Sequence, residues 1–146
     1  MTSLHWVRFL ESSAELIGID TNVLARYLVQ DDQEQAEQAS AFLESLNAHK
    51  KGYISVIVLI ELIWLLRRVY NQSRSQVAMI LDELLAIDTL VFEHQALVLQ
   101  ALAIYHTMSS DFSDLLIHKI NQQQGCVYTV TFDKGAVNKA GMTKLQ

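Results

Sequence analysis

Acidic residues stand at three places in this sequence where an element is expected to begin or end, and a further acid interrupts an apolar stretch. Asp20 directly follows the apolar run "LIGI", and Asp133 ends the β-branched stretch "CVYTVTFD". Asp111 and Asp114 fall in the first turn of a predicted helix, and Glu61 interrupts the most apolar stretch of the chain, "YISVIVLIELIWLL". Carboxylate oxygens are the ligands that hard cations prefer in proteins. The pattern therefore indicates a Mg²⁺ or Mn²⁺ site.

Four of these acids also have an ordinary structural explanation. Asp20 can cap a helix, Asp133 can open a turn, and acids in a first helical turn interact favourably with the helix dipole. Glu61 is less ordinary, because apolar residues flank it on both sides and no nearby residue supplies a cation. We expect its carboxylate to be hard to solvate and to need a partner, and a divalent cation is a suitable one.

The apolar patterns predict strands that alternate with helices. Short strands are expected at residues 16–20, 53–55, 89–92 and 126–133, of which the last is the clearest. Helices are expected at residues 21–29, 31–48, 56–70, 73–87, 93–108 and 109–125. Gly52 marks a break, and the tail after Asp133 suits a short helix followed by an edge strand.

This alternation indicates an α/β domain with a mainly parallel sheet. Ligands of such sheets bind at the carboxyl ends of the strands. Since Asp20 and Asp133 each end a predicted strand, we expect both carboxylates at the same edge of the sheet.

Size and charge limit the class of protein. The 146 residues, 51% of them hydrophobic and 18% charged, are expected to form one soluble domain over residues 16–146, preceded by an N-terminal helix or arm over residues 1–15. A net charge of −5 argues against a nonspecific nucleic-acid coat but is compatible with an enzyme that acts on nucleic acid through metal ions. No apolar run reaches the ~20 residues of a membrane span, and the lone Cys126 suits a reducing cytoplasm.

Four segments resemble, in order, the acidic motifs of PIN-domain ribonucleases, and the resemblance is strongest to VapC-type toxins of bacterial toxin–antitoxin pairs. The segments are "IDTNVL", "ISVIVLIEL", "SSDFSDLLIHKI" and "VYTVTFDKGA", and the similarity spans Ile17 to Leu145. It implies a three-layer α/β/α sandwich with a short, mainly parallel central sheet. It also implies Mg²⁺- or Mn²⁺-dependent cleavage of single-stranded or structured RNA.

The motifs carry site residues over to this sequence. The resemblance assigns four acids to catalysis and metal binding: Asp20, Glu61, Asp114 and Asp133. Asp111, one turn before Asp114, matches a position that is often acidic and assists them. Supporting polar side chains are expected at three positions: Asn22, Ser55 and Thr131.

The resemblance also implies partners. These are an RNA substrate of the tRNA or rRNA class, a cognate antitoxin that places an Arg or Lys among the acids, and a second copy of the chain. The apolar helices between Val56 and Leu85 are the candidate dimer surface. Arg26, Arg67, Arg68 and Arg74 are the candidates for binding RNA phosphates.

Three alternatives stay open. A phosphohydrolase or phosphoacceptor of another α/β family would use Asp20 as nucleophile, although Asn22 stands where such proteins place a second acid. A non-catalytic PIN-like module would bind RNA or protein only. Trp64 is expected in the core, with base stacking as its alternative role.

Overall fold

The computed structural model describes residues 14–146, so most of the predicted N-terminal extension lies outside the described residues. Two compact units make up the chain, and each is described by itself. Of the described residues, unit 1 comprises residues 14–71 and Leu84–Glu93, and unit 2 comprises Gln72–Glu83 and His94–Gln146.

Unit 1 contains the parallel sheet that the sequence predicts. Strand β1 (Glu15–Gly18) pairs with β2 (Lys50–Ile54), and β2 pairs with β3 (Leu90–Phe92), both in parallel. The strand order is β1-β2-β3, so β1 lies at an edge and has a strand neighbour on one side only. The prediction that the first strand is buried is therefore wrong, because most of its residues are exposed.

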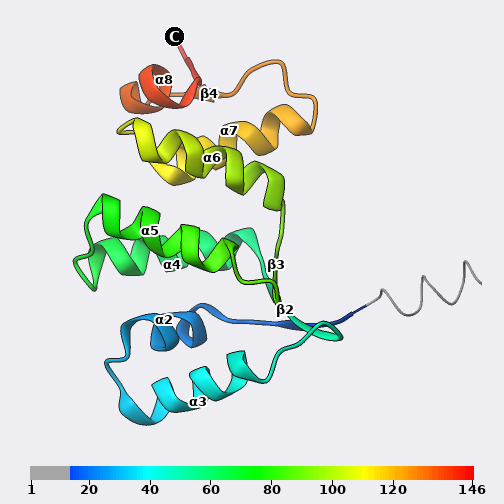
Figure 1. The fold of residues 1–146 in the computed structure, drawn as a ribbon. Helices are drawn as coiled ribbons and strands as arrows, with labels where there is room; N and C mark the ends of the chain where they lie inside the picture. Colours follow the sequence, from blue (N-terminus) through cyan, green and yellow to red (C-terminus); the bar gives the residue numbers. More distant parts are fainter. Residues whose placement is uncertain (1–13) are drawn as a thin grey trace, which may run out of the picture. The chain divides into compact units, whose positions relative to one another are not determined.

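The helices of unit 1 cover this sheet. They are α2 (Thr21–Val29), α3 (Gln33–Glu44) and α4 (Val56–Arg68), and α2 contacts both of the others. Figure 1 shows α3 and α4 on opposite sides of β1. Leu24 of α2, Ile54 of β2 and Leu62 of α4 are fully buried and form the centre of the core.

Gly52 is not the break that the sequence predicts, because it lies within β2 and is buried. A Cβ atom at this position would collide with the Ile19 side chain and lie 3.0 Å from Leu90 Cδ2. Glycine therefore allows the sheet and the side chains beside it to approach closely.

Unit 2 is mainly helical. It contains α6 (Gln95–Thr107), α7 (Phe112–Gln123) and the short α8 (Lys134–Ala140). It also contains α5 (Arg74–Leu85) as far as Glu83, and the last two residues of this helix belong to unit 1. The short strands β4 (Val130–Thr131) and β5 (Thr143–Lys144) pair in parallel, so the predicted tail helix and following strand are confirmed. Among residues 14–146, no helix is long and apolar enough to cross a membrane.

The predicted strand over residues 126–133 is largely wrong. Only Val130–Thr131 forms a strand, and its partner is β5 rather than the sheet of unit 1. Val127 and Phe132 on either side are 92% and 78% exposed. β-Branched and aromatic residues favour strands because they pack well on a sheet. They do not form a strand where no neighbouring backbone is available for pairing.

Candidate functional site

Asp20 lies where β1 leads into α2, and it caps the helix. Its Oδ1 accepts a hydrogen bond of 2.8 Å from the backbone N–H of Thr21. The side chain is exposed, and its second oxygen accepts no hydrogen bond from the described residues. Capping and metal binding are therefore compatible, because the cap orients the carboxylate and leaves one oxygen for another ligand.

Glu61 projects from the exposed side of α4, so the expectation that it would be hard to solvate is wrong. The buried residues of α4 are Leu59, Leu62, Ile63 and Leu66. At about 100° per residue they occupy one side of the helix, and Glu61 lies on the opposite side. Its Oε1 accepts a short hydrogen bond from the Thr21 hydroxyl, which links α4 to the residue beside Asp20.

Two polar groups fix the start of the helix that carries Glu61. Ser55 is the N-cap of α4, and its Oγ accepts a hydrogen bond of 3.3 Å from Val58 N–H. Glu93, directly after β3, accepts a hydrogen bond of 2.8 Å from Val56 N–H. Glu93 and Thr21 are not among the predicted site residues, since each contacts a partner that is close in space and distant in sequence.

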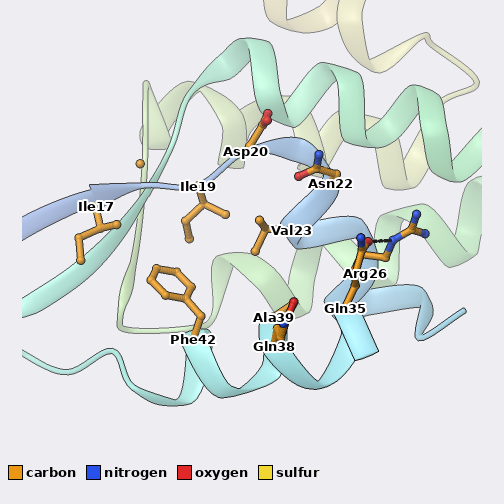
Figure 2. A pocket seen from close by; sticks show the side chains of 11 residues that line it. Ile17, Ile19, Asp20, Asn22, Val23, Arg26, Gln35, Gln38, Ala39 and Phe42 are labelled. Carbon is orange, nitrogen blue, oxygen red and sulfur yellow. Dashed lines mark hydrogen bonds between the residues drawn. The ribbon is translucent and has the colours of Figure 1, made fainter. Parts of the chain in front are cut away.

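A cavity of about 490 Å³ lies in unit 1 between β1, α2 and α3. Figure 2 shows Ile19, Val23 and Phe42 turned toward a common space, with Asp20 and Asn22 at its upper edge. Asn22 is exposed there, next to the first acid. The supporting role of Asn22 beside Asp20 stays a prediction.

The three predicted phosphate-binding arginines of unit 1 differ in their surroundings. The Arg26 guanidinium donates hydrogen bonds to Gln35 at 2.7 Å (Figure 2) and to Asp31 at 2.8 Å, with which it also forms an ion pair. It therefore links α2 to α3 and the loop between them. Arg67 and Arg68 are exposed in the last turn of α4. A role in binding RNA remains a prediction for all three.

Unit 2 brings three of the predicted acids near one another. Asp111 caps α7, and its Oδ1 accepts a hydrogen bond of 3.2 Å from the backbone N–H of Asp114. Asp133 caps α8 through a bond of 2.8 Å from Gly135 N–H. Thr131 Oγ1 accepts a bond of 3.0 Å from Asp133 N–H, so this predicted supporting residue holds the loop that carries the acid.

Asp114 lies near two other acids of unit 2. Burial raises the pKa of Asp114 above its usual value, and the neighbouring charges of Asp111 and Asp133 raise it further. Within the described part of the chain, none of the five candidate acids forms an ion pair. A divalent cation bound among these acids would relieve the repulsion, and carboxylate oxygens are its preferred ligands.

The loop before Asp111 is held by Arg74, one of the predicted phosphate-binding arginines. Arg74 at the start of α5 donates to the carbonyl oxygens of Ser110 at 2.6 Å, Tyr105 at 2.9 Å and Met108. Its Cζ lies 3.6 Å from the centroid of the Tyr105 ring. These contacts show a structural role for Arg74, and its binding of RNA phosphate stays a prediction.

The structure thus groups the acids within each unit. Asp20 and Glu61 belong to unit 1, and Asp111, Asp114 and Asp133 belong to unit 2. Over residues 14–146, no three Asp, Glu, His or Cys side chains are arranged so that they could hold a metal ion. A single centre formed by the acids of both units therefore stays a prediction.

Comparison with known families gives a match that covers most of the chain. The PIN domain matches residues 17–141, which include all five acids. Proteins of this family are typically metal-dependent nucleases, and its α/β fold with a short parallel sheet is the one predicted from the sequence. A search of curated proteins returned no similar sequence. The matched residues, in the order of the four acidic motifs, show that the chain belongs to the PIN domain family.

Proposed function

We propose that this chain is an endoribonuclease that depends on Mg²⁺ or Mn²⁺. Two observations support the proposal: the chain is a PIN domain, and the candidate acids form no ion pair with any cationic side chain of residues 14–146. The observation that carries it is the family match, which includes all five acids; the raised pKa of Asp114, caused by burial and by the charges of Asp111 and Asp133, agrees with it.

The residues of the chain have distinct roles in this proposal. Asp20, Glu61, Asp114 and Asp133 hold the metal, and Asp111 assists them. The helix caps keep the carboxylates of Asp20 and Asp133 oriented, and the Thr21 hydroxyl restrains Glu61. When bound, a divalent ion polarises the phosphate and lowers the pKa of a water molecule. A carboxylate of this set accepts the proton of the attacking water.

By resemblance, the chain is the toxin of a toxin–antitoxin pair, with tRNA or rRNA as substrate. It would act in the cytoplasm as a homodimer. The antitoxin would inhibit it by placing an Arg or Lys side chain among the acids, and their unneutralised charge is suited to such a contact. An adjacent gene for a small DNA-binding protein, and growth arrest on expression that Glu61→Gln abolishes, are the observations expected of a toxin.

RNA cleavage by the purified full chain tests the enzymatic part. We expect cleavage with Mn²⁺, none with chelator, and none by Asp114→Asn with either metal. Glu83→Gln is the matched control, because Glu83 is an exposed acid of unit 2 that is not in the motif set. Full cleavage by Asp114→Asn would refute the assignment of this acid. RNA binding without cleavage under any metal condition would favour the non-catalytic module, and phosphate trapped on Asp20 would favour the phosphoacceptor.

A further inference from the structure

One side of α4 carries an aromatic, an acidic and a basic residue in line, and all are exposed. We call this the α4 outer face: Ile57, Glu61, Trp64 and Arg68. Their spacing of four, three and four residues places them within about 60° of one another at ~100° per residue, opposite the buried side of the helix. Ile57 is 79% exposed and Trp64 is 56% exposed. Trp64 is thus not the core residue that the sequence predicts.

An exposed tryptophan in this position needs an explanation. Tryptophan is highly buried on average, and here a second large apolar side chain, Ile57, is exposed two turns earlier on the same side of α4. Glu61 and Trp64 are three residues apart and therefore neighbours on the helix surface. The acid of the proposed site and the exposed aromatic ring thus share one surface of α4.

We propose that the α4 outer face binds single-stranded RNA next to the cleavage site. A nucleobase stacks on Trp64, and the Arg68 guanidinium binds a backbone phosphate. Along the helix axis, Trp64 lies about 4.5 Å and Arg68 about 10.5 Å beyond Glu61. These intervals correspond to roughly one to three nucleotide steps. The inference rests on the proposed function, because Glu61 is one of the proposed metal-binding acids.

Single-stranded RNA suits the α4 outer face better than a second copy of the chain. A stable protein interface buries roughly 1,200–2,000 Å², whereas Ile57 and Trp64 are the two large apolar side chains exposed on α4. A buried aromatic side chain contributes at most about 250 Å², and a protein partner would also remove the charges of Glu61 and Arg68 from water at a cost. RNA needs one aromatic face and one cation, and the face supplies both.

The fluorescence of Trp64 tests the stacking contact directly. The chain has two tryptophans, so Trp6→Phe leaves Trp64 as the sole tryptophan reporter. Short oligouridylate and oligoadenylate, added without divalent metal, are expected to quench this fluorescence. Trp64→Leu should weaken RNA binding on the order of tenfold, and Trp64→Phe should retain most of it. Leu16→Ala, which alters an exposed apolar residue of β1, is the matched control and should not affect binding.

The salt dependence of binding tests the phosphate contact. Arg68→Gln should reduce the slope of log K against log salt by about 0.7, the value for one phosphate contact on a single strand. Lys51→Gln on β2 is the control, and it should leave the slope unchanged. Cleavage by Trp64→Leu should show a raised KM with an unchanged kcat.

Unchanged RNA affinity of Trp64→Leu, with its circular dichroism unaltered, would overturn the inference. A shift from dimer to monomer in sedimentation of this variant, without loss of RNA binding, would also overturn it and would assign the face to a contact between two copies. The proposed function can fail separately. If Asp114→Asn cleaves RNA normally while Trp64→Leu still loses affinity, the stacking contact holds and the assigned chemistry is wrong.

Discussion

Replacement of Arg74 by methionine tests how unit 2 positions its acids. The guanidinium binds three carbonyl oxygens at the end of α6 and in the loop before α7, where intrahelical donors are absent. That loop leads directly into Asp111 and the first turn that carries Asp114. Methionine keeps much of the aliphatic stem of the side chain and removes all of its donors. The perturbation is therefore specific to the hydrogen bonds and the charge.

The cost can be estimated contact by contact. Ser110 and Tyr105 are buried, so water cannot readily replace the guanidinium at their carbonyl oxygens, and each loss costs about 1 kcal/mol. Met108 is exposed, and water can take over its carbonyl. The stacking of the guanidinium on Tyr105 contributes about 1 kcal/mol more. We therefore expect a loss of about 3 kcal/mol, or roughly 10 °C in the unfolding midpoint.

Guanidinium chloride unfolding of the metal-free protein, followed by circular dichroism, measures this loss. Arg74→Lys should lose about half as much, because one ammonium group cannot reach all three carbonyls and does not stack as a plane. Arg68→Met is the control, since Arg68 is exposed and should change stability by less than about 0.5 kcal/mol. If Arg74→Met is as stable as this control, the contacts of Arg74 do not stabilise unit 2 and the reasoning is wrong.

Two further predictions concern the acids and the sheet. Because the pKa of Asp114 is raised in the folded state, the stability that this group contributes is present below its unfolded pKa, near 3.8, and is lost as the pH rises through the folded value. With chelator at pH 7, Asp114→Asn should therefore have a higher thermal midpoint than the natural chain. This difference should vanish at low pH. With Mn²⁺ in place of chelator, the natural chain should have the higher midpoint. Gly52→Ala should lower the free energy of unfolding by about 1–2 kcal/mol, because the added methyl group overpacks against Ile19 and Leu90. Gly18→Ala is the control and should be nearly neutral, because a Cβ atom there meets no atom within 4 Å. Equal stabilities of the two variants in chemical unfolding would contradict this account.

Local patterns along the chain were enough to predict most helices, the parallel sheet and the family. Helical periodicity and caps are local properties, so the start of α2 after Asp20 and the start of α4 after Ser55 could be predicted. The four acidic motifs likewise identify a PIN domain from residue types and order, and the family match over residues 17–141 confirms that. Local chemistry was sufficient for both.

The contacts of each side chain became visible only in the folded structure. The bond from Thr21 to Glu61 joins residues that are 40 positions apart, and the exposure of Glu61 and Trp64 depends on which side of α4 packs on the core. The strand predicted around Val130 depends on a neighbouring backbone, and β5 supplies that for two residues alone. Burial and pairing arise from contacts between distant segments, and one-dimensional patterns do not specify those contacts.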